Sequence, residues 1–359
     1  MEILSRLPVQ SLLRFKCVSK FWEALISDPY FKMKHFNCTK NGQNSQKLLI
    51  SQRSFQDGLY SFYCCPLSSP QLVQDVQKLD SPLSPRPTVF KIRCCYDGFV
   101  VVEVLDDLNG YRPTLLLWNP STRESILLPV QEFEPNGGSC FGMGYDSTSG
   151  EYKILHVYQE IDRFISLPTE ILALKGGSWR RIDKHPRGFS NVLLAMNFLA
   201  FVHAAFHWVG CSRESYFVVS FNISNEVYGE IPFPEEMLSL RGRTKFGVSV
   251  LEGMLCIHAN TYYLERKTFK LWALKEYAVK ESWIPLFAIE DPSFLNVVPK
   301  YRFANGEVLF LCMIVERPWW AFRTPNGPFV SWPQSRPQSW IVYVKLDLSE
   351  ITYLLVSYV

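Results

Sequence analysis

Two histidines, His203 and His207, stand four residues apart in "HAAFH". On a helix, this spacing presents two imidazoles to one zinc ion. The zinc peptidase motif needs a glutamate directly after the first histidine, and this chain has Ala204 there. The surrounding "FLAFVHAAFHWVG" is typical of a buried pair of strands, and no third ligand stands nearby in the sequence. We therefore predict no metal at these histidines.

Glycines and acidic pairs form the other motifs that chemistry could use. "NGGSCFGMGYD" lacks both the Gly-x-Gly-x-x-Gly spacing and the Lys-Ser/Thr ending of phosphate loops, so its glycines are expected to allow close strand packing. The pairs Asp106-Asp107 and Glu235-Glu236 are adjacent, and adjacent side chains diverge on a strand instead of facing each other as glycosidase carboxylates do. No Gly-x-Ser-x-Gly nucleophile elbow occurs. We predict no catalytic residues and no cofactor.

Composition limits the class of protein further. The 359 residues are 47% hydrophobic and 20% charged, which predicts a folded chain with one large and one small domain. The net charge of +3 is too small for a nucleic-acid groove, and the short basic clusters at Arg180-Arg181 and at Arg241, Arg243 and Lys245 are expected to be solvated turn residues. No apolar run reaches the ~18 residues of a membrane span, and no secretory signal is seen. We expect a cytoplasmic or nuclear protein with reduced cysteines and no nucleic-acid or membrane partner.

Residues 1–36 place apolar side chains at helical spacing, in three or four short helices. Ser19 is expected to cap one helix, and Asp28-Pro29 to cap and open another. Helices this short cannot bury their apolar surface among themselves, so they dock on a partner or pack on the rest of the chain. The polar residues 37–47 have the composition of a linker.

The pattern from residue 48 to residue 359 is that of an all-β domain, because short apolar runs alternate with turn residues. Each unit of a loose repeat has an apolar pair of strands and then an outer hairpin that ends near Pro or Trp. The second halves start near residues 59, 115, 170, 217, 270 and 341, a period of about fifty residues, as in kelch-type blades. Units of this kind need neighbours to bury both faces, which favours a six-unit, propeller-like ring. Residues 316–339 are expected to be an insertion, and residues 78–88 an irregular loop.

The N-terminal "ILSRLPVQSLLRFKCVSKFWEALISDPYF" resembles the plant F-box in its Leu-Pro, its Leu-Leu-Arg-Phe-x-x-Val-x-Lys and its Ile-Ser-Asp-Pro-x-Phe. The remainder is similar to the F-box-associated (F-box/kelch) domain in "WNPSTRESILLP", "FGMGYDSTSGEYKIL", "SWRRI", "HWVG", "FNISNEVYGEIPFP" and "LWALKEYAVKESWIPLF". This resemblance implies an α+β multidomain protein. An all-α F-box of three helices, the first truncated, would span residues 1–36, followed by a linker over 37–47 and a substrate-binding, all-β propeller-like domain over 48–359.

The family's function is to supply the substrate-recognition subunit of an SCF-type ubiquitin ligase. The resemblance implies that the helices bind a Skp-type adaptor, and through it a cullin, while the β domain holds an unknown protein for ubiquitination and degradation. The chain itself would be non-catalytic. Positions that match adaptor-facing residues of the family are Leu4, Leu7, Pro8, Leu12, Leu13, Val18 and Trp22, whereas Phe15 and Leu25 are expected to be internal.

For the substrate, we expect contacts from long loops that carry aromatic residues and arginines. The candidates are Trp319, Trp320, Phe322 and Arg323, followed by Arg163 and Phe164. Alternatively, the two tryptophans cover the closure between the first and last repeat units.

The start of the chain departs from the family pattern. Family members usually carry a further Leu-Pro ahead of "EILSRLP", whereas Met1 stands inside the first helix here, so we expect the recorded start to lie downstream of the true one.

Two alternative functions remain. The first is a propeller enzyme that acts on sugars, with convergent carboxylates or a metal in a central channel. The second is a binding module that has lost the adaptor interaction.

Overall fold

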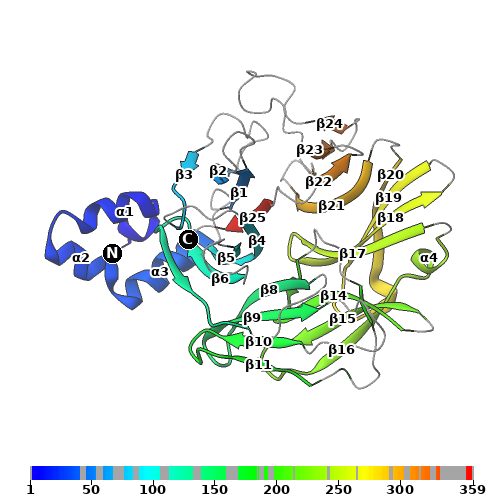
Figure 1. Cartoon of the computed structure of the whole chain (residues 1–359), viewed down its shortest axis with the longest axis horizontal. Coiled ribbons are helices and arrows are strands. Elements are labelled where there is room, and N and C mark those ends of the chain that lie inside the picture. Colours follow the sequence, from blue (N-terminus) through cyan, green and yellow to red (C-terminus); the bar gives the residue numbers. More distant parts are fainter. Residues whose placement is uncertain are drawn as a thin grey trace. The chain divides into compact units, whose positions relative to one another are not determined.

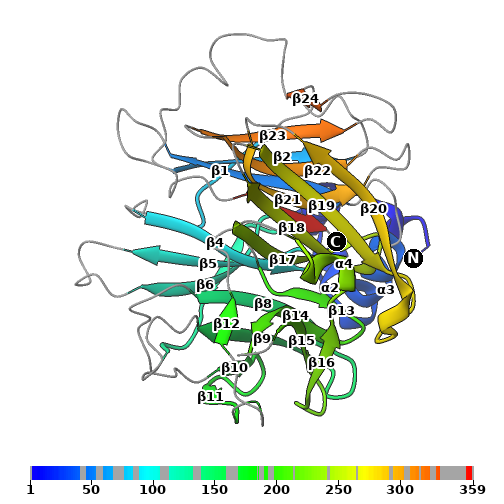
Figure 2. The ribbon, with the colours of Figure 1, turned by 90° about the vertical axis from the view of Figure 1, so that its right-hand side faces the viewer.

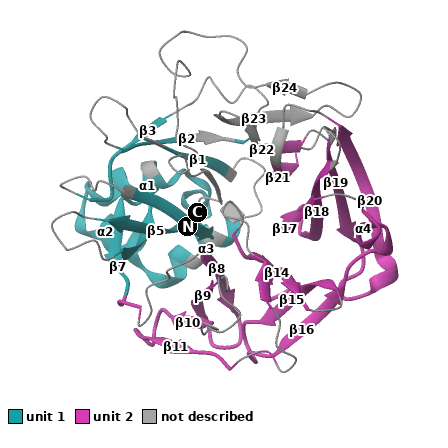
Figure 3. Ribbon diagram, turned by 45° about the vertical axis from the view of Figure 1, so that its right-hand side comes forward, with its two compact units in different colours: residues 1–128, 350–359 teal, residues 129–349 magenta. Residues whose placement is uncertain are grey.

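The structure is a computed structural model and forms two compact units, residues 1–128 with 350–359 and residues 129–349 (Figure 3). It describes residues 2–40, 46–53, 60–67, 77–83, 89–105, 113–131, 139–158, 169–183, 185, 190–192, 198–212, 215–240, 243–263, 266–290, 294–302, 308–314, 317–323, 329–331 and 353–357.

The first unit begins with the short helices η1 (Leu4–Arg6), α1 (Val9–Lys16), α2 (Lys20–Ser27) and α3 (Pro29–Lys40) (Figure 1). Both predicted caps are confirmed, because the Ser19 side chain accepts from Trp22 N and Asp28 Oδ1 accepts from Phe31 N at 3.1 Å. Helix α3 continues to Lys40 and the first strand starts at Gln46, so the structure differs from the predicted 37–47 linker.

Six antiparallel sheets follow in the described residues, as many as the predicted repeat units. The first unit holds two of them: β1 (Gln46–Arg53), β2 (Tyr60–Pro66) and β3 (Gln77–Leu79) with β25 (Tyr353–Ser357), and β4 (Val89–Tyr96), β5 (Phe99–Leu105), β6 (Thr114–Asn119) and β7 (Glu124–Leu127). Strand β25 pairs with β1, from Gln46 opposite Ser357 to Ile50 opposite Tyr353. The first sheet is therefore completed by the last described strand of the chain, as in propellers whose two ends share a blade.

In its described residues, the second unit holds the other four sheets and two short helices, α4 (Glu235–Leu238) and η3 (Lys280–Ser282) (Figure 2). Their strands are β8 (Ser139–Asp146), β9 (Glu151–Tyr158), β10 (Glu170–Ala173) and β11 (Trp179–Arg181); β12 (Ser190–Val192), β13 (Ala200–Val202), β14 (Ala205–Cys211), β15 (Tyr216–Asn222) and β16 (Tyr228–Pro232); β17 (Arg243–Leu251), β18 (Met254–Tyr263), β19 (Arg266–Leu274) and β20 (Trp283–Glu290); β21 (Phe294–Arg302), β22 (Val308–Ile314), β23 (Arg317–Arg323) and β24 (Phe329–Ser331).

The predicted insertion over residues 316–339 is wrong, because β23 and β24 lie within it and complete the last sheet. A proline is tolerated near the start of a strand, where Pro318 stands. The start of the predicted loop 78–88 likewise belongs to strand β3. Arg243 and Lys245 were expected to be turn residues, and the structure corrects this because both belong to strand β17.

Consecutive sheets of the second unit pack face to face through apolar clusters. One cluster joins β8–β11 to β12–β16 around Phe206, Val219 and Phe221, and further clusters fill the next two spaces between sheets. Both faces of a middle strand are thus buried, which explains why its sequence is a continuous apolar run.

A Trp–Pro hydrogen bond repeats between neighbouring outer strands. The Trp179 indole donates to the carbonyl oxygen of Pro129 at 2.9 Å, and the Trp283 indole to that of Pro232 at 3.0 Å. The Pro at the end of one sequence repeat therefore contacts the Trp at the end of the next repeat.

Tight turns mark one end of the sheets β8–β11, β12–β16 and β17–β20 in the second unit. Between β17 and β18, Glu252 and Gly253 have φ values of 50° and 76°, a left-handed conformation that suits a two-residue hairpin. Gly177, Glu226 and Ala278, between third and fourth strands, also have positive φ. In an up-and-down sheet, the second-to-third connection and the connection to the next sheet leave from the opposite end. The beginning of β17 and the β18–β19 connection therefore share that opposite end.

Candidate functional site

The short helices of the first unit have a small internal core. Leu12 (4% exposed), Ile26 and Phe31 are buried together, and Leu4, Leu7 and Trp22 pack against them. Leu12 was predicted to contact a partner, and the structure places its side chain in this core instead. Helical spacing identifies an apolar face but does not say whether that face turns inward or outward.

Hydrogen bonds join the two ends of this helical segment. A ring nitrogen of His35, Nε2, lies 2.8 Å from the carbonyl oxygen of Leu7 and donates to it. The Cys38 thiol donates to Ser5 Oγ at 3.7 Å, and Ser5 Oγ donates to the carbonyl oxygen of Glu2 at 2.9 Å. Cys38, in the predicted linker, is therefore part of the helical segment.

An apolar surface lies where α1 turns into α2. Val18 is 66% exposed, Phe21 70% and Phe15 36%, while Trp22 is half-buried. The rings of Phe15 and Trp22 stack with centroids 5.7 Å apart, and Phe21 meets Trp22 edge-on at 6.2 Å. We call these four residues the α1–α2 corner. An exposed apolar surface of this kind marks a site where another protein binds.

The corner includes some of the predicted contact residues and adds others. Val18 and Trp22 were predicted, whereas Phe15 was expected to be internal and Phe21 was not predicted. Phe15 and Val18 lie close together because the connection between α1 and α2 is tight: the Val18 N–H donates to the Phe15 carbonyl oxygen at 3.0 Å. Of the other predicted contact residues, Pro8 is exposed and Leu4, Leu7 and Leu13 are half-buried; Leu25, expected to be internal, is half-buried too.

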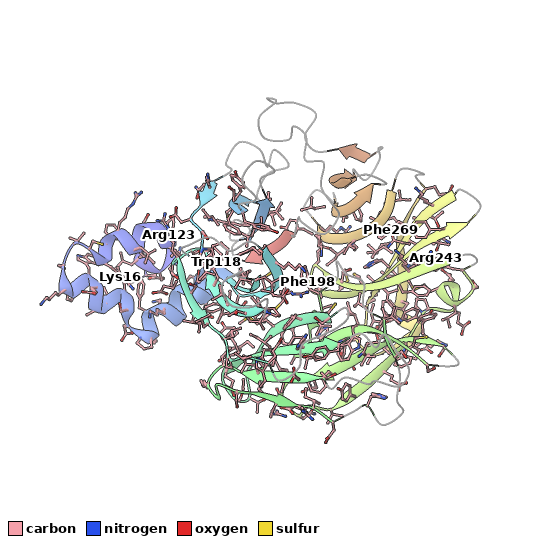
Figure 4. The ribbon with its side chains drawn as sticks, in the orientation of Figure 1. Lys16, Trp118, Arg123, Phe198, Arg243 and Phe269 are labelled. Carbon is pink, nitrogen blue, oxygen red and sulfur yellow. The ribbon has the colours of Figure 1, made fainter. Side chains whose placement is uncertain are left out.

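Basic residues surround the α1–α2 corner in the sequence. Arg14 and Lys20 are exposed and Lys16 is half-buried (Figure 4 labels Lys16). Residues 1–40 contain seven Lys and Arg and three Asp and Glu, so their formal charge is 7 − 3 = +4. This charge favours a partner with an acidic surface.

The predicted substrate-binding residues are not in described loops. Trp319, Trp320, Phe322 and Arg323 belong to strand β23, which pairs with β22, so their assignment to an insertion loop is corrected. Their role in binding stays a prediction. Arg163 and Phe164 lie outside the described residues.

The histidines His203 and His207 belong to the β13–β14 hairpin, which confirms a strand pair in place of a helix. His203 stands in the turn, and His207 Nε2 lies 2.8 Å from the Tyr277 hydroxyl. Burial lowers the pKa of His207 to about 4, so this imidazole is neutral at pH 7. Within the described part of the chain, no group of three or more His, Cys, Asp or Glu could hold a metal ion.

The remaining motifs have structural contacts. A Cβ on Gly142 would lie 2.7 Å from a Phe206 ring atom, which confirms that the glycine permits close strand packing. Of the paired acids, Glu235 pairs with Lys280 at 3.1 Å, and Glu236 Oε2 accepts from the Trp272 indole at 3.4 Å. Arg180, from a predicted basic cluster, pairs with Glu226.

Asp146 and Lys153 form a buried ion pair that joins neighbouring sheets. Their charged atoms lie 2.8 Å apart, and Lys153 Nζ also donates to the carbonyl oxygen of Ile223. Burial alone would raise the pKa of Asp146, but hydrogen bonds from Lys153, Ser224 and other donors outweigh it and hold the pKa well below its usual range. Through Ile223 and Ser224, the pair connects strands β8 and β9 to the segment that follows β15.

Comparison with known proteins gives two family matches. The family described as "F-box associated beta propeller domain" matches residues 48–319, and the F-box domain family matches residues 1–34. None of the described helices is long and apolar enough to cross a membrane.

Individual proteins are also similar. The F-box protein CPR1 of Arabidopsis thaliana is 27% identical over 321 residues, covering 81% of this chain and 72% of that protein. An F-box/kelch-repeat protein of Arabidopsis thaliana is 26% identical over 318 residues, covering 86% of this chain and 83% of that protein. Among solved structures, a lectin of Aleuria aurantia in complex with alpha-methyl-L-fucoside matches at a TM-score of 0.45 and 11% identity, covering 83% and 98% of the two chains, a similarity too low to support an argument.

Proposed function

Because this chain belongs to the F-box associated β-propeller family of plant F-box proteins, we propose that it is the substrate-recognition subunit of an SCF-type ubiquitin ligase. In this proposal the helices dock on a Skp-type adaptor, which connects them to a cullin, and the β sheets hold the protein to be ubiquitinated. The chain is non-catalytic and acts in the cytoplasm or nucleus. It raises the concentration of its substrate near the charged ubiquitin carrier.

The observation that carries this proposal is the α1–α2 corner. Val18 and Phe21 expose most of their surface although the same helices bury Leu12, Ile26 and Phe31. Burying two such side chains against a partner contributes about 1.5–3 kcal/mol each, a substantial part of the roughly 12 kcal/mol of a nanomolar complex. The basic residues Arg14 and Lys20 beside the corner add an attraction to an acidic partner.

The experiment that tests this function is assembly from purified components. The chain is mixed with a plant Skp-type adaptor, with and without the adaptor-binding part of a cullin, and the species are separated by size-exclusion chromatography with light scattering. We expect a 1:1 complex with the adaptor and a ternary complex when the cullin is added. A chain that elutes alone in both mixtures would contradict the proposal and favour a binding module without an adaptor.

A further inference from the structure

Strand β7 is the outer strand of the sheet β4–β7 in the first unit, and it exposes two aliphatic side chains (β7 is labelled in Figure 3). Ile126 is 58% exposed and Leu127 is 69% exposed. They are consecutive residues of a strand, so their side chains lie on opposite faces of the sheet. The residues opposite them on β6, Leu117 and Leu116, are both buried. The exposed apolar surface therefore lies along the edge of the sheet and includes both of its faces.

The hydrogen-bond pattern between β6 and β7 leaves main-chain groups of β7 pointing outward. The Leu128 N–H donates to the Leu115 carbonyl oxygen at 2.9 Å, so Leu128 and every second residue before it, such as Ile126, bond to β6. Ser125 and Leu127 alternate with these positions, and their N–H and carbonyl groups point away from β6. Among the described residues, no strand pairs with β7 on that side, and no hydrogen bond reaches these main-chain groups.

Other outer strands have features that oppose the addition of a further strand. Strand β3 exposes Lys78, β11 exposes Arg180, and β16 ends at the exposed Pro232. Strand β20 contains the exposed Pro285, and the register of its pairing with β19 shifts beside this residue. Charges, prolines and irregular pairing are the means by which proteins protect a sheet edge from pairing with another chain.

Strand β7 lacks this protection from Ser125 to Leu127. These residues include no charge and no proline, and their register with β6 is regular. The nearby Arg123 belongs to the preceding turn, and its charge is paired with Asp80 at 3.0 Å. A regular, uncharged and apolar edge with outward-pointing main-chain groups is a template for another strand.

We propose that the outer edge of β7 binds the protein that this chain recognises by β-strand addition, with Ser125 and Leu127 pairing to an extended segment of that protein. Donors and acceptors spaced along a strand are matched by an extended main chain. Aliphatic or β-branched side chains on both faces of the added segment would cover Ile126 and Leu127. This inference names the form in which the substrate is recognised and therefore rests on the proposed receptor function.

The test measures binding of the fluorescein-labelled peptide KTVIVTK to the full chain by fluorescence anisotropy. We expect saturable binding that weakens at least fivefold when the three central residues of the peptide are N-methylated, because methylation removes main-chain donors and keeps the side chains. Leu127→Pro should weaken binding of the unmethylated peptide to a similar extent. This substitution removes an outward N–H that makes no bond within the sheet, and an edge strand tolerates proline at such a position.

A second variant and a matched control keep the test independent of the backbone change. Leu127→Lys retains the main-chain donor and places a charge on the edge, and it should weaken binding at least threefold. The control is Ile284→Lys, which places the same charge on the outer strand β20 beside the exposed Pro285 and should bind the peptide as the parent chain does. Urea unfolding of each variant verifies that the chain is folded.

Three outcomes would overturn the inference: no binding by the parent chain, equal binding of the methylated and unmethylated peptides, or equal loss in Ile284→Lys. A dimer of the parent chain that Leu127→Pro separates, measured by light scattering, would make a second copy the occupant of the edge and would also overturn it. Adaptor binding by Leu127→Pro is measured in parallel and should equal that of the parent chain. Failure of the peptide test with normal adaptor binding rejects this site alone, whereas loss of adaptor binding by the parent chain rejects the receptor function.

Discussion

Trp22 packs against the helical core and also stacks on Phe15, with the two ring centroids 5.7 Å apart. This one side chain therefore connects buried Leu12 to the exposed α1–α2 corner. The arrangement separates two kinds of substitution in the same short segment. Changes in the core should lower the stability of the helices, whereas changes at the exposed Val18 and Phe21 should affect binding alone.

Leu12→Ala should destabilise the helical segment by about 2–5 kcal/mol, because it leaves a cavity beside Ile26 and Phe31. Val18→Ala should change stability by less than about 0.5 kcal/mol, since Val18 is 66% exposed. Urea unfolding followed by far-UV circular dichroism measures the loss of helix. Equal effects of the two substitutions would show that Leu12 is not in the core.

Adaptor binding should weaken as salt is raised, because residues 1–40 carry a formal charge of +4. Between about 0.05 and 0.5 M NaCl we expect the association rate to fall roughly tenfold while the dissociation rate changes little. Stopped-flow fluorescence measures both rates. Lys20→Glu should reproduce the slower association at low salt, and Lys175→Glu, in the second unit, should not; salt-independent association would contradict an electrostatic contribution.

Gly142→Ala should destabilise the second unit by about 1–3 kcal/mol, because the added Cβ would lie 2.8 Å from Leu199 Cβ as well as close to the Phe206 ring. Gly176→Ala is the matched control, since the nearest atom to its added Cβ is 3.5 Å away. Differential scanning calorimetry of the two variants makes the comparison. A Gly142→Ala protein as stable as the control would mean that the sheets can separate to admit a methyl group.

His258 should make the second unit sensitive to acid. It is completely buried, and burial together with the charge of Lys300 lowers its pKa to about 3. The unfolded chain takes up the proton first, near the ordinary pKa of about 6.5, so the free energy of unfolding falls as pH decreases from about 6.5 to 3. The loss is on the order of a few kcal/mol. Urea unfolding at intervals across this range measures it.

His258→Leu should remove part of this pH dependence and leave the unit at least as stable at pH 5. Neither ring nitrogen of His258 has a hydrogen-bond partner among the described residues. Replacing the imidazole with an apolar side chain of similar size therefore breaks no hydrogen bond to these residues. His207→Leu is the contrasting variant, since it removes the bond to the Tyr277 hydroxyl and should destabilise at pH 7. A strong loss of stability in His258→Leu would show that a buried water or ion binds the imidazole.

Local features were predictable from the sequence because neighbouring residues determine them. Ser19 and Asp28 cap helices through bonds to residues three positions away, and the repeat spacing located most of the sheets. The direction of a helix face was not predictable: Leu12, predicted to contact the adaptor, is buried, and Phe15, expected to be internal, is partly exposed. Strand β23 was missed because residues 316–339 were interpreted as an insertion that stretches the last repeat.

The free edge at Ser125 and Leu127 could not be predicted for a different reason. It depends on the register of β6 and β7, and a shift of one residue would turn the main-chain groups of Ile126 outward instead. The apolar outer hairpin was therefore visible in the sequence, but its outward-pointing main-chain groups were not.

The most direct test of the central claim is an isothermal titration of a plant Skp-type adaptor into the parent chain and into Val18→Asp. Val227→Asp is the control, because Val227 is 58% exposed and lies in the second unit. We predict at least a hundredfold weaker binding by Val18→Asp, since a carboxylate would be buried in an apolar contact, with unchanged affinity for Val227→Asp. Equal affinities for Val18→Asp and the parent chain would contradict docking through the α1–α2 corner.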